Sequence, residues 1–337
     1  GFIMQNDLEK FERNLALYTK SNYAVGVGNA TDAMEIFLQA LNISKGDEII
    51  ISSHTMLATA SAIKVNGGVP VPVDIGEDNL IDYEAIEDAI TPNTVGIMPT
   101  QLNGRTCKMD LITSIAEKNS LFVVEDAAQS LGSKYKGKSA GTFGLASCIS
   151  FFPAKVLGCF GDAGAVLTQD TQLYEKIYQI HDHGRDLNGE VKLWGRNSRL
   201  DNVQAGILDY KLSLYQDVIS RRRDLARMYQ EQLLVLEQLK LPPGPENHSD
   251  HFDVFQNYEI TADDRDNLKT HLSNKGIGTL IQWGGKGVHQ FHELGFNMSL
   301  PKTEAFFKSC IMLPMNAFIS HDDVTYICES IKGFYNS

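Results

Sequence analysis

The fold is decided by the stretch Val123-Val-Glu-Asp-Ala-Ala-Gln-Ser-Leu-Gly132. It is an apolar, β-branched run that ends abruptly in two acids. This pattern is typical of a buried strand whose carboxyl end opens into the ligand crevice of a parallel sheet. We therefore expect Asp126 to lie at the carboxyl edge of such a sheet.

The residues around this stretch predict a doubly wound α/β domain. Over residues 22–170, short β-rich runs alternate with helical patterns, which indicates strand, crossover helix and strand units and a mainly parallel sheet flanked by helices. The expected strands are 23–27, 48–52, 69–73, 95–99, 121–125, 147–152 and 165–168. The expected helices, with apolar spacings near three and four, are 32–41, 56–66, 83–89 and 109–119. With an amphipathic N-terminal helix, these elements form an expected large domain of residues 1–210.

The remaining chain predicts a smaller C-terminal unit. Helical patterning continues almost without interruption from residue 204 to about residue 239, and Leu241-Pro-Pro-Gly-Pro245 then ends it. A strand at 257–261, a helix at 265–275, a strand at 279–282, a Gly-rich loop and a final helix from Asp322 are expected to follow. Residues 211–337 are thus interpreted as a long connecting helix and a small α+β domain.

Composition narrows the class of protein. Hydrophobic residues make up 43% and charged residues 21% of 337 residues, which is ordinary globular usage. No segment has the length and apolarity of a membrane span, and the net charge of −12 disfavours nucleic acid as a partner. The five cysteines are scattered without a Cys-x-x-Cys pair, which favours a reducing cytoplasm, and no metal site is expected.

A second strand is expected to present a lysine at the same edge of the sheet. The stretch Ser147-Cys-Ile-Ser-Phe-Phe-Pro-Ala-Lys155 is a hydrophobic strand followed by a proline turn. Burial beside an acid can keep a lysine partly uncharged and therefore nucleophilic toward an aldehyde. Pyridoxal phosphate (PLP) requires such an amine for its Schiff base and a carboxylate for its pyridinium nitrogen. Lys155 and Asp126 are therefore the predicted catalytic pair.

A strand, a glycine turn and a helix start in Val25-Gly-Val-Gly-Asn-Ala-Thr-Asp32 provide a candidate phosphate site. Free backbone amides at a helix N-terminus attract a phosphate group. The third glycine of Gly-x-Gly-x-x-Gly is missing, so a single phosphate ester fits better than a dinucleotide pyrophosphate. Both this gap and Lys155 disfavour a nicotinamide dehydrogenase.

Five blocks of this sequence together closely resemble the DegT/DnrJ/EryC1/StrS family of sugar aminotransferases, and the resemblance covers nearly the whole chain. The blocks are Gly28-Asn-Ala-Thr-Asp-Ala33, Glu125-Asp-Ala-Ala-Gln-Ser130, Ser150-Phe-Phe-Pro-Ala-Lys155, Gly161-Asp-Ala-Gly164 and Arg196-Asn-Ser-Arg-Leu-Asp201. The resemblance implies a fold-type I, PLP-dependent aminotransferase that works as a homodimer with shared active sites.

The resemblance also implies a role for each matching residue. Lys155 holds the cofactor, Asp126 is the partner of its ring nitrogen, and Gln129 lies near its 3-hydroxyl. The remaining implied contacts are to the phosphate group, and they come from Ser150, from the amides of Ala30 and Thr31, and from Asn197 of the neighbouring subunit.

Some positions depart from the family pattern. Met56 stands where an aromatic residue commonly stacks on the cofactor ring, and its thioether is expected to cover the ring instead. The stretch Gln282-Trp-Gly-Gly285 replaces a common His-Tyr-Pro near the substrate. Because Gly1 lies close to the first expected helix, a segment that precedes this helix in relatives is expected to be absent here.

The implied reaction moves an amino group from an amino acid, by family habit L-glutamate, to a keto sugar that is nucleotide-linked. One alternative substrate is a smaller keto polyol or its phosphate, of the keto-inositol type. Another alternative is a regulatory protein that binds PLP without turnover, although the set of Asp126, Gln129 and Lys155 disfavours it.

Simpler readings of three predicted residues also stay open. Gln129 fits a surface hydrogen-bonding role and Ser150 a core hydroxyl. Asn197, with the nearby Arg199, fits a turn with a salt bridge.

Overall fold

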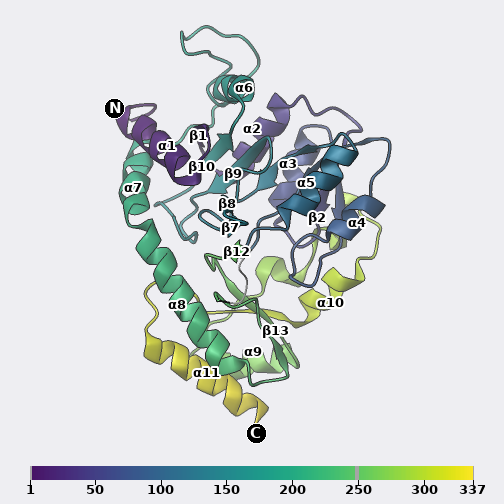
Figure 1. Ribbon diagram of the computed structural model, residues 1–337, viewed down its shortest axis with the longest axis vertical. Helices are drawn as coiled ribbons and strands as arrows, with labels where there is room; N and C mark the ends of the chain where they lie inside the picture. Colours follow the sequence, from purple (N-terminus) through teal and green to yellow (C-terminus); the bar gives the residue numbers. More distant parts are fainter. Residues whose placement is uncertain (1, 247–249, 337) are drawn as a thin grey trace.

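The computed structural model describes residues 2–246 and 250–336. Figure 1 shows a sheet with helices on both faces in the upper part of the molecule, and α8, α9 and α11 around β13 in the lower part. The long helix α8 (Tyr215–Leu233) runs between the two parts. The N-terminus lies beside α1 and the C-terminus at the opposite end of the molecule.

The upper part is built on two four-stranded sheets that continue into each other. The first has the order β3 (Val69–Val73), β2 (Glu48–Ser52), β4 (Thr94–Met98) and β5 (Phe122–Val123), all parallel. The second has the order β1 (Tyr23–Val27), β10 (Gly164–Thr168), β9 (Ala146–Ser150) and β6 (Glu125–Asp126). Only Val124 separates β5 from β6, so the two sheets share one strand direction at their junction.

The prediction of a mainly parallel sheet is confirmed, with one exception at β10. This strand is antiparallel to both of its neighbours, β1 and β9. The reason lies in the connection from β9, because residues 151–163 contain no crossover helix to return the chain to the starting edge. Lys155 therefore lies on a direct return between two neighbouring strands.

The two faces of the sheet bury alternate residues, as the period of a strand requires. Val25 and Val166 pack in one core with α2 (Ala30–Ala40), α3 (Leu57–Val65) and α6 (Thr171–His181). Ala24 and Leu167 pack in the opposite core, under α1 (Asn6–Thr19) and α7 (Asn202–Ser213). The remaining helices of this part are α4 (Tyr83–Asp88) and α5 (Met109–Lys118).

The C-terminal part has its own apolar core, formed by α8, β13, β14, α9 and α11. Its elements are β11 (Leu239–Lys240), β13 (Tyr258–Ala262), α9 (Arg265–Asn274), α10 (Pro301–Ser309), β14 (Cys310–Leu313) and α11 (His321–Tyr335), with 3-10 turns at Gln282–Gly285, Val288–Gln290 and His292–Leu294. A small sheet of β8 (Lys138–Ser139), β7 (Lys134–Tyr135) and β12 (His251–Phe252) joins it to the upper part. No helix in the described ranges has the length and apolarity needed to cross a membrane.

Three predictions of secondary structure were wrong in detail. The helix expected over 204–239 is divided at Leu214 into α7 and α8 and ends at Leu233. The strand expected at 279–282 does not form, because only Leu280 bridges to Met312 and a 3-10 turn begins at Gln282. The strand expected at 121–125 is divided into β5 and β6. In addition, α6, α10 and β14 had not been predicted. The domain boundary at residue 210 stays a prediction, and it falls inside α7.

Candidate active site

Asp126 lies at the end of β6 and is only 4% exposed. Its Oδ2 accepts a hydrogen bond from the Thr59 hydroxyl at 2.6 Å, and its Oδ1 accepts one from the Ala128 amide at 3.1 Å. The Cys148 thiol lies 3.4 Å from Oδ1. A buried carboxylate is costly unless it is hydrogen-bonded, so these contacts hold Asp126 in one orientation.

Lys155 lies on the return between β9 and β10 and is partly buried. Burial of the amine lowers the pKa of Lys155, and the negative charge of Asp126 is the largest effect that opposes it. The two groups therefore act on each other within one site at the sheet edge. Because the effect of burial is larger, the pKa of Lys155 lies below its ordinary value, the direction that favours a nucleophilic amine.

The β1–α2 turn has the geometry of a phosphate site. Asn29 caps α2 by accepting a hydrogen bond from the Asp32 amide at 2.8 Å. Within the described part of the chain, the amides of Ala30 and Thr31 have no hydrogen-bond partner, as expected in a first helical turn. A Cβ at Gly164 would lie 2.7 Å from the Ala30 nitrogen, so a glycine is needed where β10 passes the turn.

Ser150 is placed at the same turn by the strand register. It is the last residue of β9 and pairs with Gly164. Its hydroxyl accepts a hydrogen bond from the Phe152 amide at 3.3 Å, at the start of the return that carries Lys155. The structure therefore brings Ser150, Ala30 and Lys155 to one edge of the sheet.

Met56 is the residue before α3 and is 56% exposed. Its carbonyl accepts a hydrogen bond from the Thr59 amide at 3.1 Å, so Met56 lies one turn before the threonine that contacts Asp126. Its side chain is thus exposed within one helical turn of the residue that contacts Asp126. Its role in covering a cofactor ring stays a prediction.

Gln129 is not a free surface residue. Its Oε1 accepts a hydrogen bond from the Asn103 amide at 2.9 Å and a longer one from the Asn257 side chain at 3.4 Å. It therefore joins the segment after β6 to the segment after β4 and to the C-terminal part of the chain.

Nearly the whole chain matches a known family at the level of sequence. The profile described as the DegT/DnrJ/EryC1/StrS aminotransferase family matches residues 2–332. The chain belongs to this family. The prediction made from the five sequence blocks is thereby confirmed.

Individual relatives of this aminotransferase have different names. A "Pleiotropic regulatory protein" of Geobacillus stearothermophilus is 37% identical over 99% of this chain and 91% of its own length. The "dTDP-3-amino-3,4,6-trideoxy-alpha-D-glucose transaminase" of Streptomyces venezuelae is 34% identical over 98% of this chain and 88% of its own length.

A solved structure confirms the fold. The crystal structure described as "S. venezuelae DesV in complex with ketimine intermediate" superposes with a TM-score of 0.95 at 33% identity. The superposition covers 100% of this chain and 91% of that chain. The prediction of a fold-type I α/β architecture is therefore confirmed.

Asn197 is exposed in this member of the aminotransferase family. The next residue, Ser198, donates a hydrogen bond to Asp32 at 2.5 Å and accepts one from the Gly28 amide at 3.0 Å. Asn197 therefore lies beside the β1–α2 turn of its own chain, and its contact with a phosphate of the neighbouring subunit stays a prediction. Arg199 forms an ion pair with Asp182 at 2.9 Å, which agrees with the simpler reading of this residue.

Sequence reasoning missed a buried polar cluster that joins the site to the C-terminal part. The Asn103 side chain accepts hydrogen bonds from Asn257 at 2.7 Å and Gln282 at 2.9 Å, and it donates one to Glu259 at 2.7 Å. His54 lies 3.5 Å from the same Glu259 oxygen, and burial lowers the pKa of His54. These residues come from distant segments, so no local sequence pattern could have brought them together.

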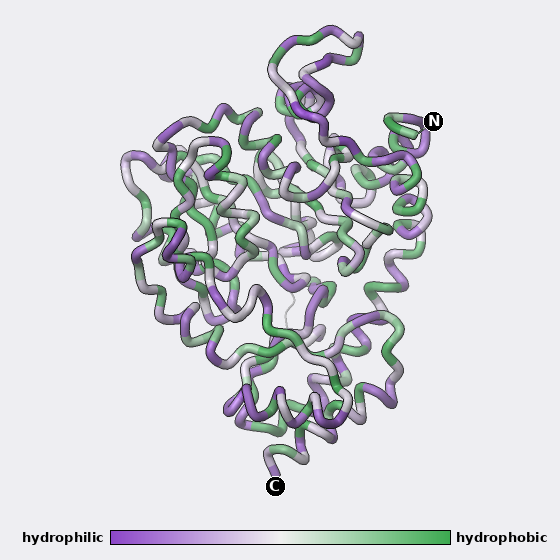
Figure 2. Tube along the Cα trace, turned by 180° about the vertical axis from the view of Figure 1, so that it is seen from behind, coloured by the Kyte–Doolittle hydropathy of each residue, from purple (hydrophilic) through white to green (hydrophobic). Residues whose placement is uncertain are grey.

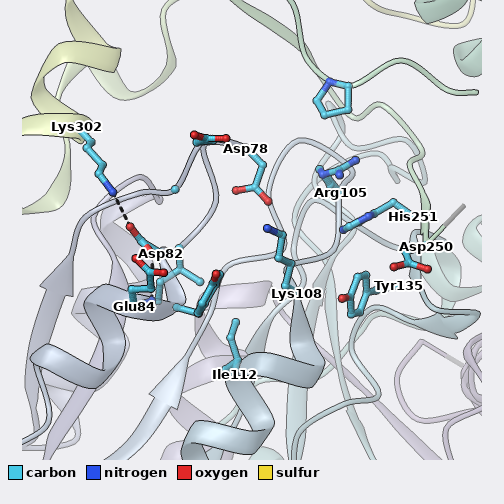
Figure 3. Close-up of a pocket in the computed structure, with 15 residues that line it drawn as sticks. Asp78, Asp82, Glu84, Arg105, Lys108, Ile112, Tyr135, Asp250, His251 and Lys302 are labelled. Carbon is cyan, nitrogen blue, oxygen red and sulfur yellow. Dashed lines mark hydrogen bonds and ion pairs between the residues drawn. The ribbon is translucent and has the colours of Figure 1, made fainter. Parts of the chain in front are cut away.

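A separate cavity of about 730 Å³ is lined by neither Asp126 nor Lys155. Figure 3 shows Asp78, Arg105, Lys108 and Tyr135 around it, and the Lys302–Asp82 ion pair of 2.7 Å at one side. Because the groups that carry the chemistry are elsewhere, we assign the active site by the geometry of the sheet edge.

Proposed function

We propose that this protein transfers an amino group from an amino acid, such as L-glutamate, to a keto sugar carried on a nucleotide, with PLP as its cofactor. The observation that carries this proposal is the position of Lys155 on the return after β9, next to β6 and its buried Asp126 carboxylate. The names of the relatives support the class of substrate.

The residues at the sheet edge fit PLP. Lys155 would hold its aldehyde carbon, and Asp126 would hold its ring nitrogen in the protonated form. Ser150 and the free amides of Ala30 and Thr31 would hold its phosphate at the turn that Gly164 keeps open. When bound, the cofactor supplies an electron sink that stabilises negative charge at the α-carbon of the amino donor.

The protein's own part in the reaction is to move protons and to fix the reacting groups. The Lys155 amine, once released, would remove the proton from the α-carbon of the donor as a general base. The Thr59 hydroxyl and the Ala128 amide orient Asp126. Gln129, held by Asn103 and Asn257, would border the cofactor on the side of the C-terminal part.

A second copy of this chain is the proposed partner. Figure 1 shows the loop after α6 projecting from the molecule, and Figure 2 shows that hydrophobic and hydrophilic segments alternate along it. Its Leu187, Val191 and Trp194 are 73%, 69% and 93% exposed. Large apolar side chains exposed on one loop favour its burial against another subunit. Asn197 follows at the base of the same loop, so burial of the loop would bring it to the subunit boundary.

The proposed location is the cytoplasm. All five cysteines are unpaired and buried, which suits a reducing compartment.

The experiment that tests the function is a pair of half-reactions. Protein loaded with PLP is mixed with L-glutamate, and the visible absorption of the lysine-bound cofactor and the release of 2-oxoglutarate are followed. We expect the band to disappear, and a nucleotide-linked keto sugar to restore it while an amino sugar forms. If only a keto polyol restores the band, the substrate belongs to that class instead. If no amino acid removes the band, a regulatory protein that binds PLP without turnover is favoured.

The dimer is tested by light scattering coupled to gel filtration. Dimeric mass is expected for the wild type, and Asn197→Ala should weaken cofactor retention without changing that mass. A monomer that transfers amino groups would contradict shared active sites.

A further inference from the structure

The backbone on both sides of Lys155 is held by one side chain from the C-terminal part. Gln256 Oε1 accepts a hydrogen bond from the Val156 amide at 2.9 Å, and Gln256 Nε2 donates one to the Ala154 carbonyl at 3.0 Å. Gln256 is only 7% exposed. Its carboxamide thus binds the two peptide groups that flank the lysine, one through its acceptor and one through its donor.

Gln256 is in turn fixed by a buried arginine. Arg222 of α8 donates hydrogen bonds to the carbonyl of Phe255 at 2.8 Å and to that of Gln256 at 2.7 Å. Phe255 has a φ of 52°, a backbone conformation that phenylalanine rarely adopts without outside support. Hydrogen bonds from a charged guanidinium are stronger than neutral ones, so Arg222 provides that support.

The return that carries Lys155 has no regular secondary structure. Residues 151–163 form neither helix nor strand. Main-chain hydrogen bonds within it run from the Lys155 amide to the Phe152 carbonyl at 2.8 Å, and from the Cys159 amide to the Phe151 carbonyl and the Phe151 amide to the Ala163 carbonyl, both at 2.9 Å. Phe152 and Phe160 are 51% and 81% exposed, so they contribute little packing to it within one chain. Phe151 and Leu157 anchor the return in the core, and the Ala154 carbonyl and the Val156 amide beside the lysine are bound by Gln256.

We propose that Gln256 is a positioning residue that fixes the backbone of Lys155, so that the amine points at the site beside Asp126. The inference rests on the proposed function, because it assigns the lysine to covalent attachment of the cofactor. Attachment of the cofactor and proton transfer both become slower when the amine is displaced by a small distance. The hydrogen bonds from Gln256 to the backbone beside Lys155 limit such displacement, so they are expected to raise both rates. Gln256 does not itself touch the reacting atoms.

The test uses Gln256→Met, which keeps the length of the side chain and removes both hydrogen bonds. The matched control is Gln230→Met, the same change at a glutamine of α8 that accepts a hydrogen bond from the Tyr258 hydroxyl at 3.3 Å and does not contact the return. The first measurement is hydrogen–deuterium exchange of the Val156 amide in protein without PLP. Exchange should be about tenfold faster in Gln256→Met, since each hydrogen bond contributes a modest stabilisation, and unchanged in the control.

The second measurement is the rate at which added PLP becomes attached to Lys155, trapped by borohydride and located by mass spectrometry. Gln256→Met should attach PLP about tenfold more slowly than the wild type and the control. Gln256→Glu serves if Gln256→Met does not fold, because its carboxylate still accepts from the Val156 amide but cannot donate to Ala154 when ionised. It should keep Val156 protected and still attach PLP more slowly.

The possible results separate the two proposals. Attachment at the wild-type rate in either folded variant overturns the positioning role, as does Val156 exchange that is unchanged in Gln256→Met. Failure of wild-type protein to attach PLP at Lys155 refutes the proposed function instead, and the exchange measurement still reports whether Gln256 holds the return.

Discussion

Replacing Thr59 with valine tests whether the contacts of Asp126 are as strong as the geometry indicates. The Thr59 hydroxyl donates to Asp126 Oδ2 at 2.6 Å, and Thr59 is fully buried. Valine has nearly the same volume, so the change removes the hydroxyl without opening a cavity. The Thr55 hydroxyl, 2.9 Å from that of Thr59, keeps its contact with the Thr100 hydroxyl at 2.8 Å.

The expected cost follows from the charge of the acceptor. A hydrogen bond to a charged group contributes about 1.5–3 kcal/mol, and the variant leaves one buried carboxylate oxygen without its donor. We therefore expect Thr59→Val to lower the free energy of unfolding of PLP-free protein by about 2–3 kcal/mol. Urea denaturation at neutral pH, followed by circular dichroism, measures the change.

The control is Thr19→Val, at an equally buried threonine whose hydroxyl donates to the neutral Leu15 carbonyl at 2.8 Å. Loss of a neutral hydrogen bond should cost only about 1 kcal/mol. If the two variants are destabilised equally, the reasoning that Thr59 stabilises a buried charge is refuted.

The remaining predictions concern the reacting groups and one partly buried acid. Lys155→Ala should abolish both attachment of PLP and amino transfer, and mass spectrometry after borohydride treatment would show the loss; retention of both removes the main assignment. Asp126→Asn should keep the cofactor but slow removal of the donor's α-proton by at least about a hundredfold, measured in a stopped-flow half-reaction; an unchanged rate contradicts its role at the ring nitrogen. Burial raises the pKa of Glu12 from 4.5 to about 7, so ionisation of this carboxylate destabilises the fold as pH rises through that window. Glu12→Gln should therefore stabilise the protein above pH 7 and have little effect below pH 4.5, and urea midpoints that change equally at both pH values would show otherwise.

Local patterns in the sequence were sufficient for most of the upper part. The runs ending at Asp126 and before Lys155 were recognisable because a buried strand is continuously apolar and a polar residue at its end stands out. The helices expected at 32–41, 56–66, 83–89 and 109–119 agree with α2, α3, α4 and α5 within about two residues.

The errors occurred where tertiary contacts override local preference. The direction of β10, which the prediction of a mainly parallel sheet left open, depends on the short connection through Lys155 rather than on the residues of the strand itself. The expected strand at 279–282 does not form. The Gln282 side chain donates a hydrogen bond to Asn103, and the chain turns at Trp283, where φ is 48°. Gln256 could not be recognised, because a polar residue before a strand gives no sign of a partner a hundred positions away.

The pairing of β12 with β7 restricts how this molecule can open. His251 and Phe252 pair with Tyr135 and Lys134, and the Val254 amide donates to the Gly104 carbonyl at 2.9 Å. A hinge rotation of the C-terminal part away from the sheet would have to break these main-chain bonds. Ligands are therefore expected to enter and leave through movements of surface loops, without a hinge motion between the two parts. The affinity for the cofactor should then not depend on such a hinge motion.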